Sequence, residues 1–410
     1  MNNRAEHKYL SQLLSFRLDP ALRTAILIYL MIRIISAVAA TWVVQTAPPK
    51  IDWKRQPIYD LHEVAFTTQG PVRDWLEPWY RWDTGWYINI AYDGYQKGEG
   101  SIIFAPLYPW SMRAVAPLVG DDYLLAGLIV SNIACIVALT LLYKLVAADY
   151  GDLIAQQTVL LYMVFPTAFY LVAAYTESLF LALALGAWLA VRRDRYLLAG
   201  LVAFFASLTR SQGWILALPF AYMLYIQPTG KLPDLKKPLP LVKRMPAVIG
   251  GPLGTALYLF GMRFAGLGSI EQAFKQPPWQ TNVVMPWTTL AKTIRVIIEG
   301  PVHDIDLANI AALIFVVILA AVVTIRLRKP EYWLYIWPTL LFILLRDHYL
   351  IVLHGMLRYV IDMFPIFIAL ALVLRGSSRL KRVARVLYVI ISFGIQVLLV
   401  TLFAEWLWVA

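Results

Sequence analysis

The sequence contains little charge, one cysteine and few histidines. Only 15% of its 410 residues are charged and 60% are hydrophobic, whereas soluble domains average about 25% charged residues. The mean hydropathy is +0.64. The single cysteine, Cys135, lies in an apolar run, which excludes a disulfide framework and a cysteine-based metal site. This composition predicts an integral membrane protein, and the long unbroken apolar runs favour helices over a barrel.

The formal net charge of +11 is not read as a nucleic-acid signal. The basic residues cluster between hydrophobic runs, which is where lysine and arginine orient membrane helices. The chain begins with a polar segment, and its first apolar run is long enough to cross a bilayer. We therefore expect no cleavable signal peptide and no nucleic-acid partner.

Apolar runs predict about eleven membrane spans in a single all-α, polytopic domain over residues 1–410. The predicted spans are about 21–44, 123–147, 154–174, 178–191, two within 196–227, 246–265, 307–325, 332–345, 359–374 and 386–403.

Charge then predicts the topology. The basic clusters at 192–195, 231–244, 326–329 and 375–385 all fall in the cytoplasm only if 196–227 crosses twice, with a hinge at Arg210. The other polar segments then share the outer face of the membrane. These are a large first outer loop (45–122), the region of Glu177, Arg210, a second outer loop (266–305) and a patch at 346–358. Short interfacial helices are predicted at 57–69 and 83–93 in the first loop, and the apolar run 103–118 is placed in the interface.

The first outer loop holds ten acidic residues against seven lysines and arginines, and within it one carboxylate is surrounded by aromatic residues. Asp83 lies between Trp82 and the pair Trp86 and Tyr87. A partly desolvated carboxylate can act as a general base, and aromatic faces pack well against sugar rings. The alternative is a helix cap, because aspartate is a preferred N-cap residue and Asp93-Gly94 would end the same helix. Both interpretations stay open.

Two further polar features flank apolar runs. Prolines 106 and 109 fix a turn around Tyr108. This turn is either a wall of a sugar pocket, a point where the chain re-enters the membrane, or a turn with a structural role alone. Glu177 lies between two apolar runs. It either contacts an acceptor hydroxyl, anchors the Asp83 loop or opens the next helix as part of a cap.

Several cations lie at membrane depth or at the surface. Arg210 either binds a phosphate or forms a structural ion pair, for which Glu177 is a candidate partner. His354 and Arg358 are four residues apart and predicted on one helical face. There they either bind phosphate or extend their polar ends to the water at the membrane interface. Arg33 either pairs with an inner acid such as Asp149 or Asp152 or lines a donor groove. No HxxxH or DxD-type pair occurs in 346–358, so no metal is indicated.

Taken together, several blocks resemble the PIG-V-type mannosyltransferases of GPI-anchor synthesis and their bacterial relatives, within the GT-C glycosyltransferases. The blocks are WDTGWYINIAYDGY (82–95), FAPLYP (104–109), the segment 165–180 with FYLVAAYTESLF, TRSQG (209–213) and RY…FP (358–365). The resemblance implies a multi-span fold with the catalytic acid, here Asp83, in the first outer loop. It also implies a polyprenyl-phosphate sugar donor, dolichyl-phosphate mannose in PIG-V-type enzymes. The family's YWN-type block is missing after 266, where QPPWQ (276–280) takes a similar place.

These observations predict an inverting mannosyltransferase that uses a polyprenyl-phosphate donor and a lipid-linked or glycan acceptor. Asp83 is the expected base, and no cofactor or metal is required. The expected donor-phosphate ligands are Arg210, Arg358 and His354. The expected substrate contacts are Trp82, Trp86, Tyr87, Tyr108, Glu177 and Trp279. The expected location is the plasma membrane if the source is bacterial, with the site on the extracytoplasmic face. The alternatives are a transporter or lipid flippase, to which intramembrane arginines are suited, and a non-catalytic subunit of a glycosyltransferase complex.

Overall fold

The computed structural model describes residues 19–47, 67–98, 100–231, 238–277 and 279–409. Nearly all of the regular structure is helical. The exception is a two-stranded ribbon, β1 (Thr281–Val283) with β2 (Arg346–His348). The chain is therefore an all-α membrane protein, as predicted from its composition.

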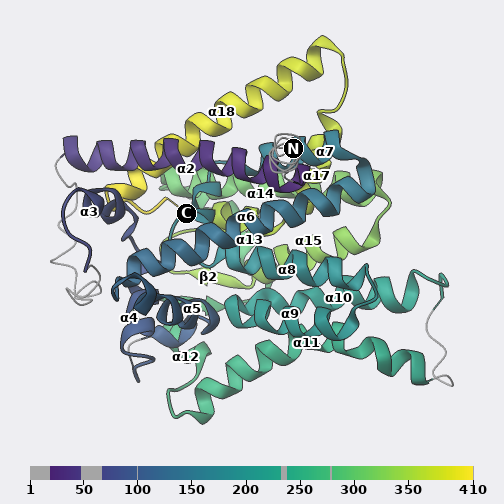
Figure 1. The fold of residues 1–410 in the computed structure, drawn as a ribbon, viewed down its shortest axis with the longest axis horizontal. Helices are drawn as coiled ribbons and strands as arrows, with labels where there is room; N and C mark the ends of the chain where they lie inside the picture. Colours follow the sequence, from purple (N-terminus) through teal and green to yellow (C-terminus); the bar gives the residue numbers. More distant parts are fainter. Residues whose placement is uncertain (1–18, 48–66, 99, 232–237, 278, 410) are drawn as a thin grey trace, which may run out of the picture.

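Long helices pack side by side in a row that crosses Figure 1 from top to bottom, each in contact with the next. In order, they are α18 (Arg379–Ala404), α2 (Pro20–Thr46), α6 (Tyr123–Tyr150), α8 (Glu177–Val191), α9 (Tyr196–Thr209) and α11 (Pro238–Phe264).

Local sequence signals set the ends of these helices. Asp19 accepts a hydrogen bond from the amide of Ala21 at the start of α2, where Pro20 is the first helical residue. Asp122 caps α6 through the amide of Leu125, and Gly151 (φ 83°) follows its last residue.

Five described helices are long and apolar enough to cross a membrane, and a bent helix pair would make a sixth. They are α2, α6, residues 241–264 of α11, the segment 304–327 that contains α14 (Asp304–Val322), and α18. The apolar helices α8 and α9 have only 15 and 14 residues, below the roughly 20 that a straight span needs. The protein is thus multi-pass, and the predicted count of eleven spans is not confirmed.

Two predicted spans are interrupted. The predicted span 154–174 is α7 (Asp152–Met163) followed by turns and a short 3₁₀ helix, η7 (Ala168–Leu171), because Pro166 cannot continue an α-helix. The predicted span 359–374 is bent by 84° between Met356–Asp362 and Pro365–Val373, which is α17. Both interruptions lie among buried side chains, where irregular backbone is tolerated at membrane depth.

The break predicted at Arg210 is present. Arg210 is extended (φ −145°, ψ 129°) between α9 and the 3₁₀ helix η8 (Ser211–Leu216). The chain continues through α10 (Ala217–Ala221) and a π-helical turn, Tyr222–Ile226.

The first predicted outer loop is largely helical where it is described. It contains α3 (Pro71–Leu76), α4 (Asp83–Tyr92), and α5 (Leu107–Val115), which begins at the two prolines. The helix predicted at 83–93 is therefore present, but it is not a surface helix, because Trp86, Tyr87 and Ile90 are buried. The helix predicted at 57–69 lies mainly outside the described residues.

The second predicted outer loop, 266–305, also contains regular structure. Helix α12 (Ile270–Lys275), strand β1 and helix α13 (Pro286–Glu299) follow one another. Strand β1 pairs antiparallel with β2, which directly follows α15 (Pro330–Leu344). Thr281 lies opposite His348 and Val283 opposite Arg346, so the ribbon joins two segments that are distant in the sequence.

Three of the predicted basic clusters share one end of the molecule. Arg192, Arg244 and Lys329 line one polar pocket, and both Arg192 and Lys329 pair with Asp149. Helices α4, α5 and α12 gather at the left-hand end of Figure 1, away from the α10 end. The grouping of these clusters agrees with the predicted topology.

Candidate functional site

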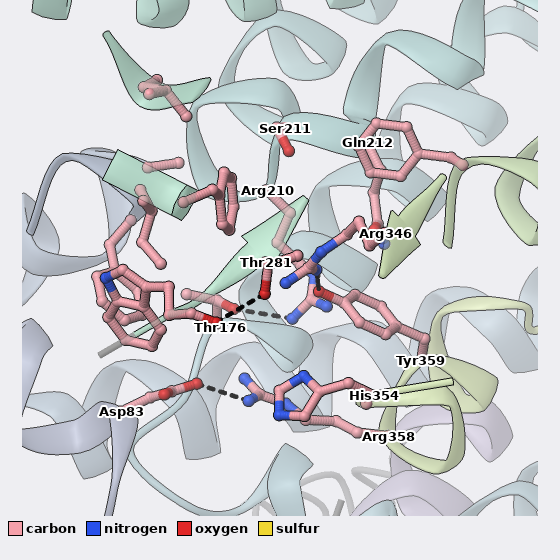
Figure 2. A pocket seen from close by; sticks show the side chains of 18 of the residues that line it. Asp83, Thr176, Arg210, Ser211, Gln212, Thr281, Arg346, His354, Arg358 and Tyr359 are labelled. Atoms are coloured by element: carbon pink, nitrogen blue, oxygen red, sulfur yellow. Dashed lines mark hydrogen bonds and ion pairs between the residues drawn. The ribbon is translucent and has the colours of Figure 1, made fainter. Parts of the chain in front are cut away.

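A cavity of about 560 Å³ brings together the polar segments that were predicted to share one face. Its wall is formed by α4, η8, α11, α12, the β1–β2 ribbon, the end of α15, residues 354–359 and Trp408. Figure 2 shows Asp83 pointing from one side of this cavity towards Arg358, with His354 beside it and Arg346 and Tyr359 nearby. Sequence positions 83, 210, 279, 346 and 354 thus meet in one place.

Asp83 is the first residue of α4 and not its N-cap, which is Trp82 (φ 52°). Its Oδ2 accepts a hydrogen bond from Nη1 of Arg358 at 2.6 Å, and the Asp83 side chain is 13% exposed. The helix-cap interpretation of Asp83 is therefore wrong. The carboxylate is directed into the cavity and held by a charge-assisted hydrogen bond.

Glu177 lies beneath the cavity wall and connects two arginines. Its Oε1 accepts from Nη1 of Arg210 at 2.7 Å and from Nε of Arg358, and its side chain is fully buried. It does not line the cavity. Of the open interpretations of Glu177, the structure supports an anchor for the Asp83 site and not a contact with substrate.

Arg210 and Arg358 are both committed to carboxylates. Arg210 also pairs with Asp362 at 3.0 Å, and Asp362 accepts a further hydrogen bond from Gln212 at 2.7 Å. The Arg358 guanidinium lies over the rings of Tyr170 and Tyr175. The ion pair suggested between Arg210 and Glu177 is present. Because both guanidinium groups already neutralise buried acids, neither is a free cation for an incoming anion.

Arg346 is the arginine of the cavity wall that has no carboxylate partner among the described residues. Its Nη1 donates to the hydroxyl of Tyr359, and its guanidinium lies 5.1 Å from the ring centroid of Phe274. Sequence reasoning placed Arg346 in the polar patch 346–358 but did not select it. Its position two residues before His348 in β2 puts both side chains on one face of the strand, and this strand was not predicted from the sequence.

His354 and Arg358 do not share a helical face. Gly355 (φ 78°) precedes the short helix α16 (Met356–Tyr359), so His354 lies in the turn before it. The His354 ring stacks between His348, at 4.4 Å between centroids, and Trp408, at 5.2 Å.

Burial lowers the pKa of His354 well below its usual value, and nearby His348, Arg346 and Arg358 act in the same direction. Burial, followed by Lys292 and Arg346, also lowers the pKa of His348. His354 is consequently neutral at pH 7, and the prediction that it serves as a cationic phosphate ligand does not fit its surroundings.

Four of the predicted aromatic residues line the cavity, and one does not. Trp82, Trp86, Tyr87 and Trp279 are in the wall. Trp279 packs on Trp86 with 5.4 Å between ring centroids, and its Nε1 donates to the carbonyl of Gly100. Tyr108 is fully buried behind Tyr87, and its hydroxyl is hydrogen-bonded with Ser131 at 2.7 Å. Its predicted contact with substrate is therefore not supported.

Sequence reasoning also missed Trp408. This residue lines the cavity and packs edge-on against Trp82, with 5.2 Å between ring centroids. No local pattern around Trp408 indicates this place, because the contact depends on how the chain returns to α4 after α18.

The cavity lining includes apolar as well as charged side chains. Trp214 of η8, Leu259 of α11 and Phe342 of α15 line it, together with Val283 and Ile270. The lining is therefore amphiphilic and combines arginines, histidines and Asp83 with aliphatic and aromatic side chains.

Arg33 lies outside this cavity. Its guanidinium stacks over Trp79 at 4.4 Å from the ring centroid, while Asp149 pairs with Arg192 and Lys329. The suggested pairing of Arg33 with an inner acid is wrong for the described residues, because its guanidinium packs on the Trp79 ring and contacts no carboxylate there. Within the same part of the chain, no three histidine, cysteine or acidic side chains are arranged to hold a metal ion.

The comparisons with known proteins include matches to mannosyltransferases. Residues 104–249 match the family model described as dolichyl-phosphate-mannose-protein mannosyltransferase. GPI mannosyltransferase 2 of Cryptococcus neoformans is 31% identical over 171 residues, which cover 39% of this chain and 38% of that protein. GPI mannosyltransferase 2 of Yarrowia lipolytica is 29% identical over 204 residues, which cover 48% of this chain and 53% of that protein.

The matched region spans about half or less of these curated relatives. Among solved structures, the apo oligosaccharyltransferase of Archaeoglobus fulgidus is 13% identical with a TM-score of 0.44, over 91% of this chain and 56% of that one. The family model and the two mannosyltransferases confirm the predicted resemblance of this chain to the PIG-V-type, GPI-mannosyltransferase-like proteins of the GT-C superfamily.

Proposed function

We propose that the protein is an inverting glycosyltransferase that transfers mannose from a polyprenyl-phosphate donor to a lipid-linked or glycan acceptor. The observation that carries this proposal is the amphiphilic cavity, which is lined by Asp83 and arginines and also by apolar side chains of η8, α11 and α15. A donor with a sugar, one phosphate and a prenyl chain requires both kinds of lining. The matching mannosyltransferases support the choice of sugar.

Arg346 is the ligand we assign to the donor phosphate. It lines the cavity, its guanidinium lies over the ring of Phe274, and it has no carboxylate partner in the described part of the chain. A guanidinium group presents a fork of N–H donors that matches phosphate oxygens. The prenyl chain then runs past Trp214, Leu259 and Phe342 towards the lipid.

The transferred sugar lies between the phosphate site and Asp83. Trp86 and Trp279, 5.4 Å apart between ring centroids, and Tyr87 line the cavity and are the proposed contacts of this sugar. Aromatic faces of this kind pack against the C–H face of a sugar while leaving its hydroxyl groups free for polar contacts.

Asp83 acts as the general base. Its Oδ2 is engaged by Arg358, whereas its Oδ1 has no hydrogen bond among the described residues and is free to accept a proton. Oδ1 takes the proton of the acceptor hydroxyl as that oxygen forms a bond to the anomeric carbon. The bond from that carbon to the phosphate oxygen breaks on the opposite face, and its electron pair leaves with the polyprenyl phosphate. Arg346 stabilises the charge that develops there.

An ion-pair network holds the base, Asp83, in place through Arg358. Its other members are Glu177, Arg210 and Asp362. The described ion pairs connect Asp83 to Arg358, Arg358 to Glu177, Glu177 to Arg210 and Arg210 to Asp362. A base held at the end of such a network keeps its orientation during the reaction, which favours proton transfer.

The site is assigned to the extracytoplasmic face. The basic residues Arg192, Arg244 and Lys329 gather at another pocket of the molecule, and positively charged loops face the cytoplasm in most membrane proteins. In a bacterial source, this membrane is the plasma membrane.

The proposal is tested with the purified full chain in phospholipid nanodiscs and a radiolabelled polyprenyl-phosphate mannose. The expected result is release of polyprenyl phosphate together with transfer of mannose to an alkyl glycoside acceptor, with an anomeric configuration opposite to that of the donor. Movement of the labelled lipid between leaflets without cleavage of the sugar–phosphate bond would establish the flippase alternative instead.

A further inference from the structure

Helix α13 (Pro286–Glu299) has an exposed apolar face. The exposed side chains recur at the spacing of one helical face and are Trp287, Leu290, Ile294, Ile297 and Ile298, with Ile298 77% exposed. Thr288, Arg295 and Glu299 follow the same helical spacing on a second, polar side. Thr289 and Thr293 are buried on a third side against the protein.

The position of α13 in the chain places it at a membrane surface. It ends at Glu299, and the apolar segment 304–327, long enough to cross a bilayer, begins five residues later. The preceding candidate span ends at Phe264. A helix with separate apolar and polar faces that directly precedes a span is suited to lie in the plane of the water–lipid boundary.

The opposite side of α13 is attached to the cavity wall. Lys292 Nζ donates to Oδ1 of Asp347 at 2.7 Å and to the backbone oxygen of His348 at 2.6 Å. Thr289 Oγ1 donates to the backbone oxygen of Leu344, the last residue of α15, at 2.8 Å. The helix therefore contacts both α15 and β2.

Strand geometry connects Lys292 to the cavity. Successive side chains of a strand point to opposite faces. Arg346 and His348 line the cavity, whereas Asp347 between them pairs with Lys292 on the other side. Any movement of Asp347 relative to α13 moves the backbone that carries Arg346.

We propose that α13 lies in the bilayer interface with its apolar face in lipid and that Lys292, through Asp347, positions Arg346 in the cavity. The lipid contact of α13 does not depend on the proposed function. The effect of Lys292 on phosphate binding does rest on the proposed function. Lys292 is a positioning residue, because its ammonium group contacts β2 and not the cavity.

The lipid contact is tested with nitroxide labels on the full chain in phospholipid nanodiscs. Ile298→Cys reports the apolar face and Arg295→Cys the polar face, both in a Cys135→Ala background. We expect the label at 298 to collide more with oxygen than with a water-soluble nickel chelate, and the label at 295 to show the opposite preference. If the label at 298 collides with the nickel chelate in preference to oxygen, as the label at 295 is expected to do, the proposed lipid contact is overturned.

The positioning role is tested by binding of undecaprenyl phosphate to nanodisc-held variants. Lys292→Met is expected to raise the Kd about threefold to tenfold, as for loss of a partly exposed ion pair. Lys292→Arg and Arg295→Met are the matched controls and are expected to bind within about twofold of the original chain. Donor KM should rise in parallel for Lys292→Met, with an unchanged unfolding midpoint and an unchanged acceptor KM.

Arg346→Gln separates the two proposals. If Arg346→Gln weakens binding of undecaprenyl phosphate and Lys292→Met does not, the positioning role is refuted while the phosphate site stands. If neither substitution changes the Kd, the phosphate site assigned to Arg346 is wrong, and the role of Lys292 is refuted with it.

Discussion

Asp83 and Arg358 are 275 residues apart in the sequence, and in the structure the Oδ2 atom of Asp83 and the Nη1 atom of Arg358 are 2.6 Å apart. Their ion pair joins the first turn of α4 to the short helix α16, at the end of the polar patch 346–358. It also leaves one carboxylate oxygen of Asp83 without a hydrogen bond among the described residues, in a cavity with an amphiphilic lining.

Asp83→Asn is expected to lower kcat for mannose transfer by about 10²–10⁴-fold, the usual contribution of a general base. Asparagine keeps an oxygen that accepts from Arg358, and Glu177 still neutralises Arg358, so the protein should stay folded and its thermal unfolding midpoint should fall less than that of Glu177→Gln. The measurement is turnover with a radiolabelled donor, paired with a melting curve. Turnover close to that of the original chain would remove Asp83 from the role of base.

Arg346→Gln is expected to raise the donor KM about tenfold or more, because charge-assisted hydrogen bonds to phosphate contribute roughly 1.5–3 kcal/mol. Arg346→Lys should recover only part of this, since an ammonium group cannot make the paired contact of a guanidinium. Acceptor KM should stay constant in both variants. Arg358→Ala is the contrasting case and should lower kcat, because it releases Asp83.

Glu177→Gln is expected to destabilise the fold by about 3–5 kcal/mol, because it leaves the buried guanidinium groups of Arg210 and Arg358 without part of their counter-charge. The unfolding midpoint in a chemical denaturant measures this. Glu271→Gln, which removes an exposed i, i+4 pair with Lys275, is the control and should leave the midpoint nearly unchanged.

The stacked histidines predict a pH dependence of stability. The pKa values of His348 and His354 are lowered in the folded protein, so the unfolded chain binds more protons below the ordinary histidine pKa of about 6.5. Stability is therefore complete above about pH 6.5 and falls as the pH decreases towards the lowered values. Arg346, Lys292 and Arg358 add repulsion to any charge on the rings, and Asp347 opposes it for His348.

Melting curves between about pH 5 and pH 8 measure this effect. His354→Gln removes one of the two groups and should flatten the dependence. A dependence that is unchanged in His354→Gln would show that other groups cause it.

Chelation of divalent metal is expected to leave transfer activity unchanged. No three potential ligands lie together within the described ranges, and phosphate charge is assigned to Arg346. The measurement compares initial rates with and without EDTA, followed by addition of Mg²⁺ or Mn²⁺. Loss of activity with EDTA and recovery with one of these ions would contradict the prediction.

Charge distribution along the sequence was enough to predict which segments meet. Placing the basic clusters on one side put Asp83, Glu177 and Arg210 on the other, and these residues form one ion-pair network with Arg358. This works because lysine and arginine partition between loops by a rule that does not depend on tertiary packing.

The assignment of the phosphate ligand could not be predicted in the same way. Arg210, Arg346 and Arg358 look alike in the sequence, and only the position of Glu177 between two of them decides which one is left for a ligand. The contacts of Trp408 could not be predicted either, because they depend on the path of the chain after α18. Gly355, in contrast, was a visible sign that His354 and Arg358 are not on one helix.

The β1–β2 ribbon has a further consequence for insertions and deletions near the cavity. A shift of β2 by one residue would exchange the two faces of the strand. Arg346 and His348 would then point away, and Asp347 would enter the cavity in their place. One added or lost amino acid between α15 and this strand would thus replace a cation with an anion on the wall, and a chamber suited to phosphate would repel it.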